Sequence, residues 1–288
     1  MIDITRIEAA CSEAVLAASI GYEPAKIKVW EKAIETESEE NSRWILEMLL
    51  ENAYTAREKR LPMCDDTGIP YVLIEIGRDA KINGNPAKII DAAEAGIAEG
   101  LRRLPGRPMA VKGDSFDRIT QEKGLYEDSG MVFPSPVRMK SVSGSKIKIT
   151  VLLQGGGPEI RGRTYRVFHH HNLDTFRTEI AGWAVEMARL LGCTPCVPAI
   201  GVGRTHYEAN CLMMDAMAYG VFGEQNDLEK FITEKVNESN TGPLGIGGKI
   251  TALQTFSRIG YQRASGIRVV SMRVGCIVDP RRHSLILE

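Results

Sequence analysis

The chain has 288 residues, a length that accommodates one large domain or two small ones and a substantial apolar core without disulfides or metal staples. Hydrophobic residues make up 43% and charged residues 25%, as in soluble globular proteins, and the formal net charge of -1 argues against a nucleic acid as the main partner. No apolar run is long enough for a signal peptide or a membrane span, which predicts a cytoplasmic protein with no membrane partner.

The first third of the chain, about 1–105, is predicted to be mostly helical. Apolar residues recur near the 3.6-residue helical period over about 4–20 and again over about 23–57. A third helix is expected over about 86–104, between an Asn-Gly-Asn-Pro start and a Pro-Gly stop. Only residues 71–76 interrupt this pattern, as an apolar run that predicts a strand.

The chain from about 132 to 288 is predicted to mix strands with helices. Segments 136–140 and 146–153 alternate or run apolar on either side of Ser-Gly-Ser, which is typical of a β-hairpin. A buried strand is expected over 267–277, with helices over about 173–191, 206–221 and 227–238 and a short final strand over 284–287. We therefore expect a mixed α/β fold in which helices pack with a mixed sheet, formed as one domain of residues 1–288.

The cysteines are the first candidates for chemistry. Six of them are spread along the chain, which in a reducing compartment indicates thiols, metal ligands or catalysis rather than a disulfide framework. Cys64 opens the sequence Cys-Asp-Asp-Thr-Gly in a loop that enters the predicted strand at Tyr71. A thiol beside two carboxylates suits a functional site, but Asp-Asp-Thr-Gly is equally good turn chemistry.

Cys193 and Cys196 form a Cys-x-x-Cys pair at the end of the helix predicted over 173–191. Such a pair suits redox chemistry or a metal, but a thioredoxin-type site needs a helix that starts, not ends, at the first cysteine. Cys276 ends the last long strand, just before the cationic turn Asp279–Arg282. This turn can bind an anion or stabilise a thiolate, and a buried structural cysteine is the alternative.

Two glycine-rich segments and a histidine run are weaker candidates. Gly155–Gly157 and the Gly-Ile-Gly-Gly-Lys segment at 245–249, which precedes an expected short helix, permit close approach of the backbone to an anion. Tight turns explain both equally well, and the second segment lacks the spacing of a nucleotide-binding P-loop. The side chains of His169–His171 would alternate in direction on an extended segment, which favours a solvated polar run over a metal site.

In their order along the chain, these elements resemble the alpha subunit, or N-terminal half, of class I fumarases and L-tartrate dehydratases. The family motifs are C-Q/D-D-T-G, K-G-G-G-S-E-N, C-P-P, G-I-G-G-T, L-G-x-G-G-K-T and C-W-A-x-R-R. Their counterparts here are Cys64–Gly68, Gln154–Ile160, Cys196–Pro198, Gly201–Thr205, Leu244–Thr251 and Cys276–Arg282. The resemblance covers about 60–288, and the helices before it are compatible.

The resemblance implies the mixed α/β fold of the family's alpha domain and a four-iron, four-sulfur (4Fe-4S) cluster. The cluster ligands would be Cys64, Cys196 and Cys276, and Cys193 would not be needed. Three protein ligands leave one iron with an open position for Lewis-acid chemistry, whereas electron-transfer clusters normally have four.

The resemblance further implies a hydro-lyase of the fumarate hydratase or tartrate dehydratase type that acts on a small carboxylic acid. Asp66 would be the catalytic residue beside the substrate, and Asp65, Thr67, Gly156 and Gly157 would bind the substrate. Because family dehydratases also need a beta-type domain, the expected partners are a separate beta-type subunit, a second copy of the chain, or both.

Several departures from the family motifs define an alternative function. Gln154 stands where the family has a lysine, Arg204 stands where it has a glycine, and residues 260–265 lack its active-site histidine. The alternative is therefore a divergent homologue that binds a cluster or metal but has lost or changed the dehydratase activity. A zinc site built from the four thiols of Cys64, Cys193, Cys196 and Cys276 is a third possibility.

Overall fold

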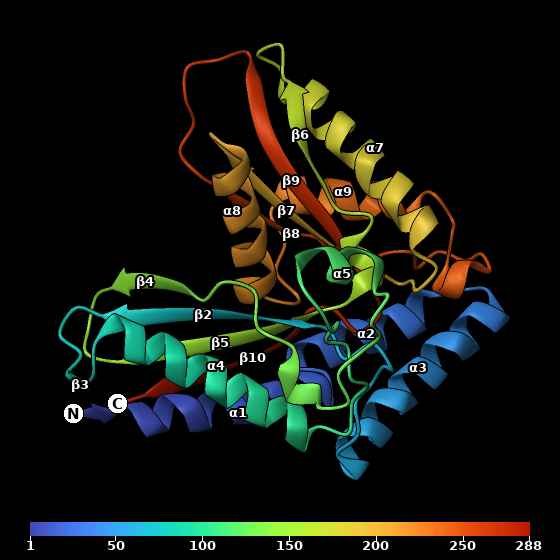
Figure 1. Cartoon of the computed structure of the whole chain (residues 1–288). Coiled ribbons are helices and arrows are strands. Elements are labelled where there is room, and N and C mark those ends of the chain that lie inside the picture. The colour runs from blue at the N-terminus through green and yellow to red at the C-terminus, as the bar shows by residue number, and fades with distance from the viewer. The chain divides into compact units, whose positions relative to one another are not determined.

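A computed structural model describes all 288 residues and has the mixed α/β fold predicted from the sequence (Figure 1). By its internal contacts the chain divides into two compact units. The first unit comprises residues 1–21, 53–155 and 281–288, and the second comprises 22–52 and 156–280. Each unit is therefore assembled from segments that are distant in the sequence. None of the helices combines the length and the apolar character needed to cross a bilayer.

A four-stranded sheet in the order β10-β5-β2-β4 forms the framework of the first unit. Strand β2 (Ile69–Gly77) pairs antiparallel with β5 (Ile147–Gln154) and parallel with β4 (Arg138–Val142). Strand β10 (Arg281–Leu287) pairs antiparallel with β5 and so forms one edge. This sheet thus joins the second and third segments of the first unit.

Helices α1 (Ile4–Ser19) and α4 (Pro86–Arg103) pack on one face of this sheet and share its apolar core (Figure 1). The side chain of Asn85 caps α4 by accepting a hydrogen bond from Lys88 N, as the Asn-Pro start predicted. Gly96 lets the two helices approach closely, because a Cβ there would clash with the backbone of α1. The smaller elements are β1 (Ile2–Asp3), β3 (Ile82–Asn83), α5 (Ser115–Thr120) and a 3-10 turn at Ser129–Met131.

The predicted hairpin of residues 136–140 and 146–153 is wrong. Both strands form, but β2 lies between them and pairs with each. The Ser-Gly-Ser link spans the end of β2, where Gly77 N donates to Lys146 O at 2.9 Å. A Cβ on Gly77 would clash with Gly144 O, so a glycine is required where the link crosses β2. Pairing with a strand some 70 residues earlier leaves no local signal in the sequence.

The second unit contains another four-stranded sheet, in the order β6-β9-β7-β8. Strand β9 (Ile267–Gly275) is central and pairs antiparallel with β6 (Arg163–Phe168) and with β7 (Val197–Gly203). Strand β8 (Phe256–Ile259) pairs parallel with β7. Only β9 was predicted, because proline and glycines interrupt the apolar pattern of β7. The short helix expected after Thr251 is absent, since the chain leads directly into β8.

Helices cover both faces of this second sheet (Figure 1). Helices α7 (Leu173–Leu191) and α9 (Asp227–Asn237) pack on the face that carries Ile200 of β7 and Met272 of β9. Helix α8 (His206–Tyr219) packs on the other face. All three helices confirm the sequence prediction to within two residues at each end.

The helix predicted over 23–57 is two helices, α2 (Pro24–Thr36) and α3 (Glu40–Lys59). Glu37 adopts an extended backbone conformation between them. Its buried carboxylate accepts hydrogen bonds from Glu39 N and from Ile250 N, both at 3.0 Å. The Glu37 carboxylate, at the break between the helices, thus accepts a hydrogen bond from a residue far along the chain. Apolar periodicity cannot reveal such a contact.

Candidate functional site

The loop that carries Cys64 in the first unit is fixed by Arg281 of β10. Arg281 is 2% exposed, and its Nη1 donates hydrogen bonds to the carbonyl oxygens of Asp66 and Thr67. The Thr67 hydroxyl donates to Arg107 O at 2.9 Å, and Gly68 N donates to the Asp66 carboxylate at 3.1 Å. The cationic turn noticed in the sequence therefore positions the Cys-Asp-Asp-Thr-Gly loop, a role that the sequence did not suggest.

The Cys64 thiol is half-buried and lies close to charges of both signs. Burial raises the pKa of this thiol above its ordinary value, while the Asp66 backbone N–H and the Arg281 guanidinium act in the opposite direction. The thiol also donates to the Asp65 carboxylate at 3.6 Å, and that side chain is 86% exposed. A thiolate at Cys64 would have a nearby cation to stabilise it.

The Gly155–Gly157 turn begins beside this loop at the end of β5. In the strand register Gln154 is opposite Ile69, so the turn starts next to the end of the Cys64 loop. A Cβ on Gly155 would lie 3.0 Å from Asp66 Oδ2 and 3.2 Å from Arg281 Nη2, so a glycine leaves space for both side chains. Gly156 is exposed, and the position of a Cβ on Gly157 has open space around it. Short helix α6 (Gly156–Glu159) follows, within the second unit.

Cys196 and Cys276 meet in the second unit, at neighbouring strand ends. The last residue pair between β7 and β9 is Val197 with Gly275, and the two cysteines are the next residues beyond this pair. Cys276 packs against the apolar cluster that contains Cys196. Burial raises the pKa of the Cys196 thiol to about 12, so only a strong electrophile such as a metal would hold it as a thiolate.

Residues on either side of the second glycine-rich segment (245–249) hold the turn before Cys196. Cys196 N donates to Thr251 O at 2.8 Å, and Leu253 N donates to Cys196 O at 2.9 Å. Thr194 Oγ1 donates to Gly242 O. The residues that flank this segment therefore support the Cys193–Cys196 turn. Cys193 itself is exposed.

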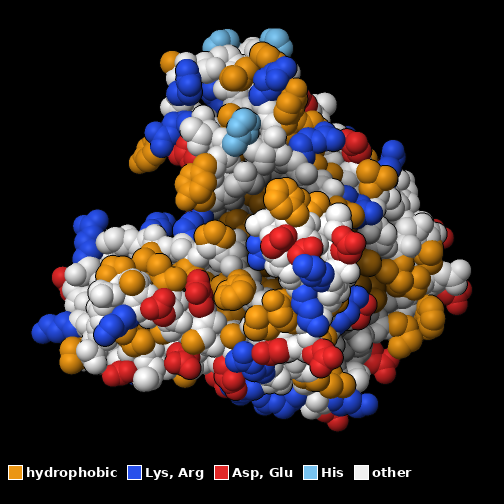
Figure 2. Space-filling view, in the orientation of Figure 1, with side chains coloured by type: hydrophobic (Ala, Val, Ile, Leu, Met, Phe, Trp, Pro, Cys, Tyr) orange, Lys and Arg blue, Asp and Glu red, His pale blue; other side chains and the backbone are white.

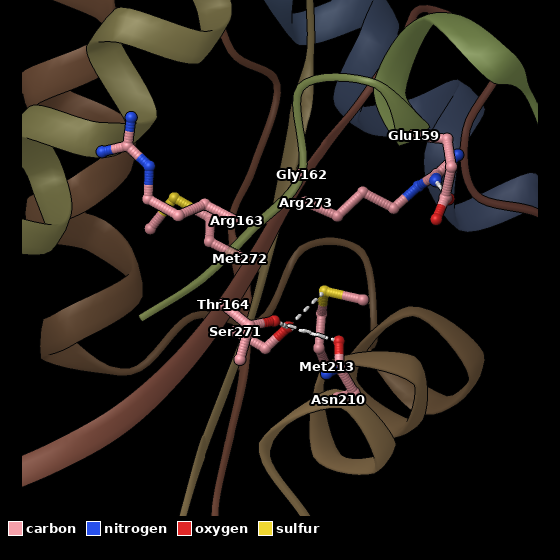
Figure 3. A pocket seen from close by; sticks show the side chains of 9 residues that line it. All are labelled: Glu159, Gly162, Arg163, Thr164, Asn210, Met213, Ser271, Met272 and Arg273. Atoms are coloured by element: carbon pink, nitrogen blue, oxygen red, sulfur yellow. Dashed lines mark hydrogen bonds and ion pairs between the residues drawn. The ribbon is translucent and has the colours of Figure 1, made fainter. Parts of the chain in front are cut away.

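A cavity of about 170 Å³ lies between β6, β9 and α8 of the second unit (Figure 3). Thr164 and Ser271 point toward Asn210 and Met213 of α8, and the Ser271 hydroxyl donates to Asn210 Oδ1 at 2.8 Å (Figure 3). Arg163, by contrast, extends away from them. At the end of the cavity, the buried guanidinium of Arg273 pairs with the carboxylate of Glu159 on α6 (Figure 3). This polar cavity was not expected from the sequence, because its lining residues come from three separated segments.

The histidine run makes local hydrogen bonds. His169 Nε2 bonds to Ser265 O at 2.9 Å and its Nδ1 accepts from His171 N at 3.0 Å, while His170 and His171 adopt positive φ values of 47° and 53°. In neither unit do three or more His, Cys, Asp or Glu side chains converge on one metal position.

On the face seen in Figure 2, acidic and basic side chains are interspersed.

The predicted site residues thus fall into two sets. The first unit holds Cys64, Asp65, Asp66 and Thr67 in one loop, and the second holds Cys196 beside Cys276. All three predicted ligands are thiols without a disulfide, which are the donors that iron–sulfur clusters prefer. The donor chemistry of the chain therefore fits such a cluster.

Comparisons with known proteins show that the chain is similar to proteins named as hydratases and dehydratases. Residues 8–285 match the sequence model of the fumarate hydratase (Fumerase) family. A Methanocaldococcus jannaschii protein named as an L(+)-tartrate dehydratase subunit alpha is 28% identical over 271 residues, which cover 90% of this chain and 88% of that protein.

Two fumarate hydratases are also similar. A Geobacillus stearothermophilus protein named as a class I fumarate hydratase is 25% identical over 221 residues, covering 72% of this chain and 41% of that protein. Fumarate hydratase 2 of Leishmania major is 26% identical over 272 residues, covering 87% of this chain and 44% of that protein. The chain thus spans less than half of these two fumarate hydratases but most of the tartrate dehydratase subunit.

Proposed function

Because the chain belongs to the fumarate hydratase family, we propose that it is the cluster-binding alpha-type subunit of an iron–sulfur hydro-lyase. It would add water to, or remove water from, a small hydroxy-carboxylic acid. The names of the relatives support a hydro-lyase, and all three candidate thiols lie in segments whose sequences resemble family motifs. The observation that carries the proposal is the strand register that puts Cys196 beside Cys276.

We assign Cys64, Cys196 and Cys276 as the ligands of a 4Fe-4S cluster. When bound, a cluster with three thiolate ligands offers one iron as a Lewis acid for a substrate hydroxyl and carboxylate. The Arg281 guanidinium near Cys64 favours the thiolate form that ligation requires. Cys193 is exposed and its backbone carbonyl accepts a hydrogen bond from Ile277 N at 3.1 Å, which supports a structural role for this residue.

The substrate would be held by residues of the Cys64–Gly68 loop and of the Gly155–Gly157 turn. A residue of the loop would also remove a proton from it. Elimination of water from a hydroxy acid needs a base for a C–H proton, and we assign this role to the Asp66 carboxylate. Asp65 is exposed beside it and can contact the substrate, whereas Thr67 is buried and its hydroxyl donates to Arg107 O, so Thr67 would act by holding the loop. The exposed backbone at Gly156 and the open space at Gly157 would let a substrate carboxylate approach.

A beta-type subunit is the proposed partner. The Methanocaldococcus jannaschii relative supports this, because its name is that of an alpha subunit and the match covers 88% of it. A second copy of the chain can be present in addition. With a co-expressed beta-type subunit, we expect reversible hydration of fumarate, mesaconate or a related acid, measured by the loss of the unsaturated acid's ultraviolet absorbance.

Cluster binding is tested by anaerobic reconstitution of the wild-type chain and four variants. We expect brown wild-type protein with iron and sulfide in equal amounts and a broad visible absorbance that bleaches in air. Replacing any ligand (Cys64→Ser, Cys196→Ser or Cys276→Ser) should remove most of the iron, because three ligands are the minimum for a site-differentiated cluster. The matched control Cys193→Ser, in the same Cys-x-x-Cys pair, should keep wild-type iron content.

Colourless wild-type protein after reconstitution would contradict the proposal, and zinc in place of iron would favour the zinc site. The alternative function, a divergent homologue with lost or changed dehydratase activity, is favoured by one specific observation. Arg204 occupies a family glycine position, and its guanidinium pairs with Glu208 at 2.8 Å at the start of α8. This alternative predicts a cluster without turnover in any pairing with a beta-type subunit.

A further inference from the structure

A buried lysine from a distant helix holds the turn that follows Cys276. Lys26 lies in α2, within the second unit, and is only 1% exposed. Its Nζ donates to the carbonyl oxygens of Ile277 and Asp279, both at 2.8 Å. The side chain therefore fixes the backbone one and three residues beyond the candidate ligand.

Aromatic rings surround the Lys26 ammonium and stabilise it beside the turn. Its Nζ lies 3.9 Å from the Tyr22 ring centroid, 5.7 Å from that of Trp30 and 5.9 Å from that of Phe222. Such distances allow cation–π attraction. The Tyr22 hydroxyl also donates to Ile277 O at 3.0 Å, so this carbonyl accepts two hydrogen bonds from α2 and the residues before it.

The same turn is held by a second buried cation, Arg273. Asp279 is fully buried, and its Oδ2 accepts a hydrogen bond from Cys276 N at 3.2 Å and lies 3.7 Å from Arg273 Nη2. Asp279 N donates back to Cys276 O at 2.9 Å. The other side of the Arg273 guanidinium pairs with Glu159 at the end of the polar cavity (Figure 3). The backbone at Cys276 is thus constrained on both sides.

Stability of the fold is a poor reason to bury this lysine. Removing an ammonium from water costs several kcal/mol, which its hydrogen bonds and cation–π contacts must offset. A residue that orients a metal ligand has a functional reason to be buried. The groups that hydrogen-bond around metal ligands govern how tightly the metal is held. We propose that Lys26 is a positioning residue that holds the Cys276 turn in the conformation that ligates the cluster; this inference rests on the proposed function.

The test compares Lys26→Met with Lys28→Met, an exposed lysine on the same helix. In cluster-free protein, hydrogen exchange of the amides of Cys276 and Asp279 should become at least about tenfold faster in Lys26→Met, because their turn loses two hydrogen bonds. In reconstituted protein, a chelator should remove the cluster about tenfold to 100-fold faster. The electron paramagnetic resonance signal of the cluster should also change. Lys28→Met should match the wild type in every measurement.

Thermal melting of cluster-free protein, together with hydrogen exchange outside the turn, separates positioning from a purely structural role. Lys26→Met should melt below the wild type, because Ile277 O and Asp279 O lose a buried donor, but amides outside the turn should still exchange at the wild-type rate below the melting range. Tyr22→Phe removes a single hydrogen bond to the same turn and should show the same changes at smaller size. It keeps the inference testable should Lys26→Met not fold.

Unchanged amide exchange in the turn, or unchanged cluster loss, in a folded Lys26→Met variant would overturn the inference. Wild-type protein that takes up no iron would contradict the hydro-lyase proposal instead. In that case the exchange measurement on cluster-free protein still decides whether Lys26 holds the turn.

Discussion

Gln154 and Gln254 are buried to the same extent, at 3% and 2% exposure, but their amides have opposite surroundings. Gln254 accepts a hydrogen bond from Gly223 N at 2.8 Å and donates to the carbonyls of Val221 and Glu224 at 2.8 and 2.7 Å. Both polar atoms of the Gln154 side chain lack a hydrogen-bond partner in the protein. Because a buried amide without a partner costs free energy, Gln154 weakens the fold beside the Cys64 loop.

This contrast predicts opposite effects of the same substitution. Gln154→Met should raise the free energy of unfolding by about 1 kcal/mol, because it removes a buried polar group that has no partner. Gln254→Met should lower it by about 2 kcal/mol or more, because it leaves a buried N–H and two carbonyls unpaired. Urea unfolding of cluster-free protein measures both values. Equal destabilisation by the two substitutions would show that Gln154 is satisfied in solution.

At the scale of elements, the contact between β7 and α8 depends on Gly201, because this residue has no side chain. Gly201 lies in the middle of β7, on the face opposite the Ile200 side chain. A Cβ at Gly201 would clash with Ala209 O and Met213 N, which belong to the backbone of α8. This glycine was noticed in the sequence as part of a motif, and its structural use is close packing of a helix on a strand.

Gly201→Ala should therefore lower the free energy of unfolding by about 3 kcal/mol, as overpacking against rigid backbone does. The matched control is Gly182→Ala on the exposed side of α7, where a Cβ meets no atom within 4 Å. This control should raise the free energy of unfolding by about 0.5–1 kcal/mol, through helix propensity. Both are measured by urea unfolding. A neutral Gly201→Ala would mean that α8 shifts away from β7 at little cost.

The elements themselves were predictable where one pattern decides them. Helices α4, α7 and α9 follow from apolar periodicity and from Asn at the cap positions, since both act within a few residues. Strand pairing was not predictable, as the misplaced hairpin shows: β2 enters between β4 and β5 from a distant part of the chain. The break at Glu37 has the same origin, because its partner Ile250 N lies more than 200 residues away.

At the scale of the whole molecule, two buried thiols make the free energy of unfolding fall as the pH rises in the alkaline range. Burial raises the pKa of Cys11, in the first unit, and of Cys196, in the second, to about 12. Unfolding returns each thiol to an ordinary pKa near 9. The unfolded state then holds fewer protons than the folded state between these two values, so stability is complete below pH about 9 and falls as pH rises toward 12.

Cluster-free protein should accordingly lose about 1.4 kcal/mol of unfolding free energy per pH unit for each thiol above pH 9. Cys11→Ala should lose less, and its deficit relative to the wild type should shrink by about 2 kcal/mol between pH 8 and pH 10.5. Urea unfolding at these pH values measures the difference, in which all other titrating groups cancel. A deficit that stays constant with pH would mean that Cys11 ionises alike in both states.

The sequence alone was sufficient for the fold class, most helices, the family and the choice of Cys64, Cys196 and Cys276 as candidate ligands. Periodicity, capping residues and short motifs carry this information because each acts over a few neighbouring residues. The assignment of these three thiols as ligands stays a proposal until iron is measured.

Only the tertiary structure decided which distant residues support the candidate site. It brought Arg281 to the Cys64 loop, Lys26 to the turn after Cys276, and Arg273 to Glu159 beside a polar cavity. Each of these contacts joins segments that are more than 100 residues apart and depends on how sheets and helices pack. A buried cation finds its acceptors only when the whole unit is folded, and no local pattern in the sequence records where they will be.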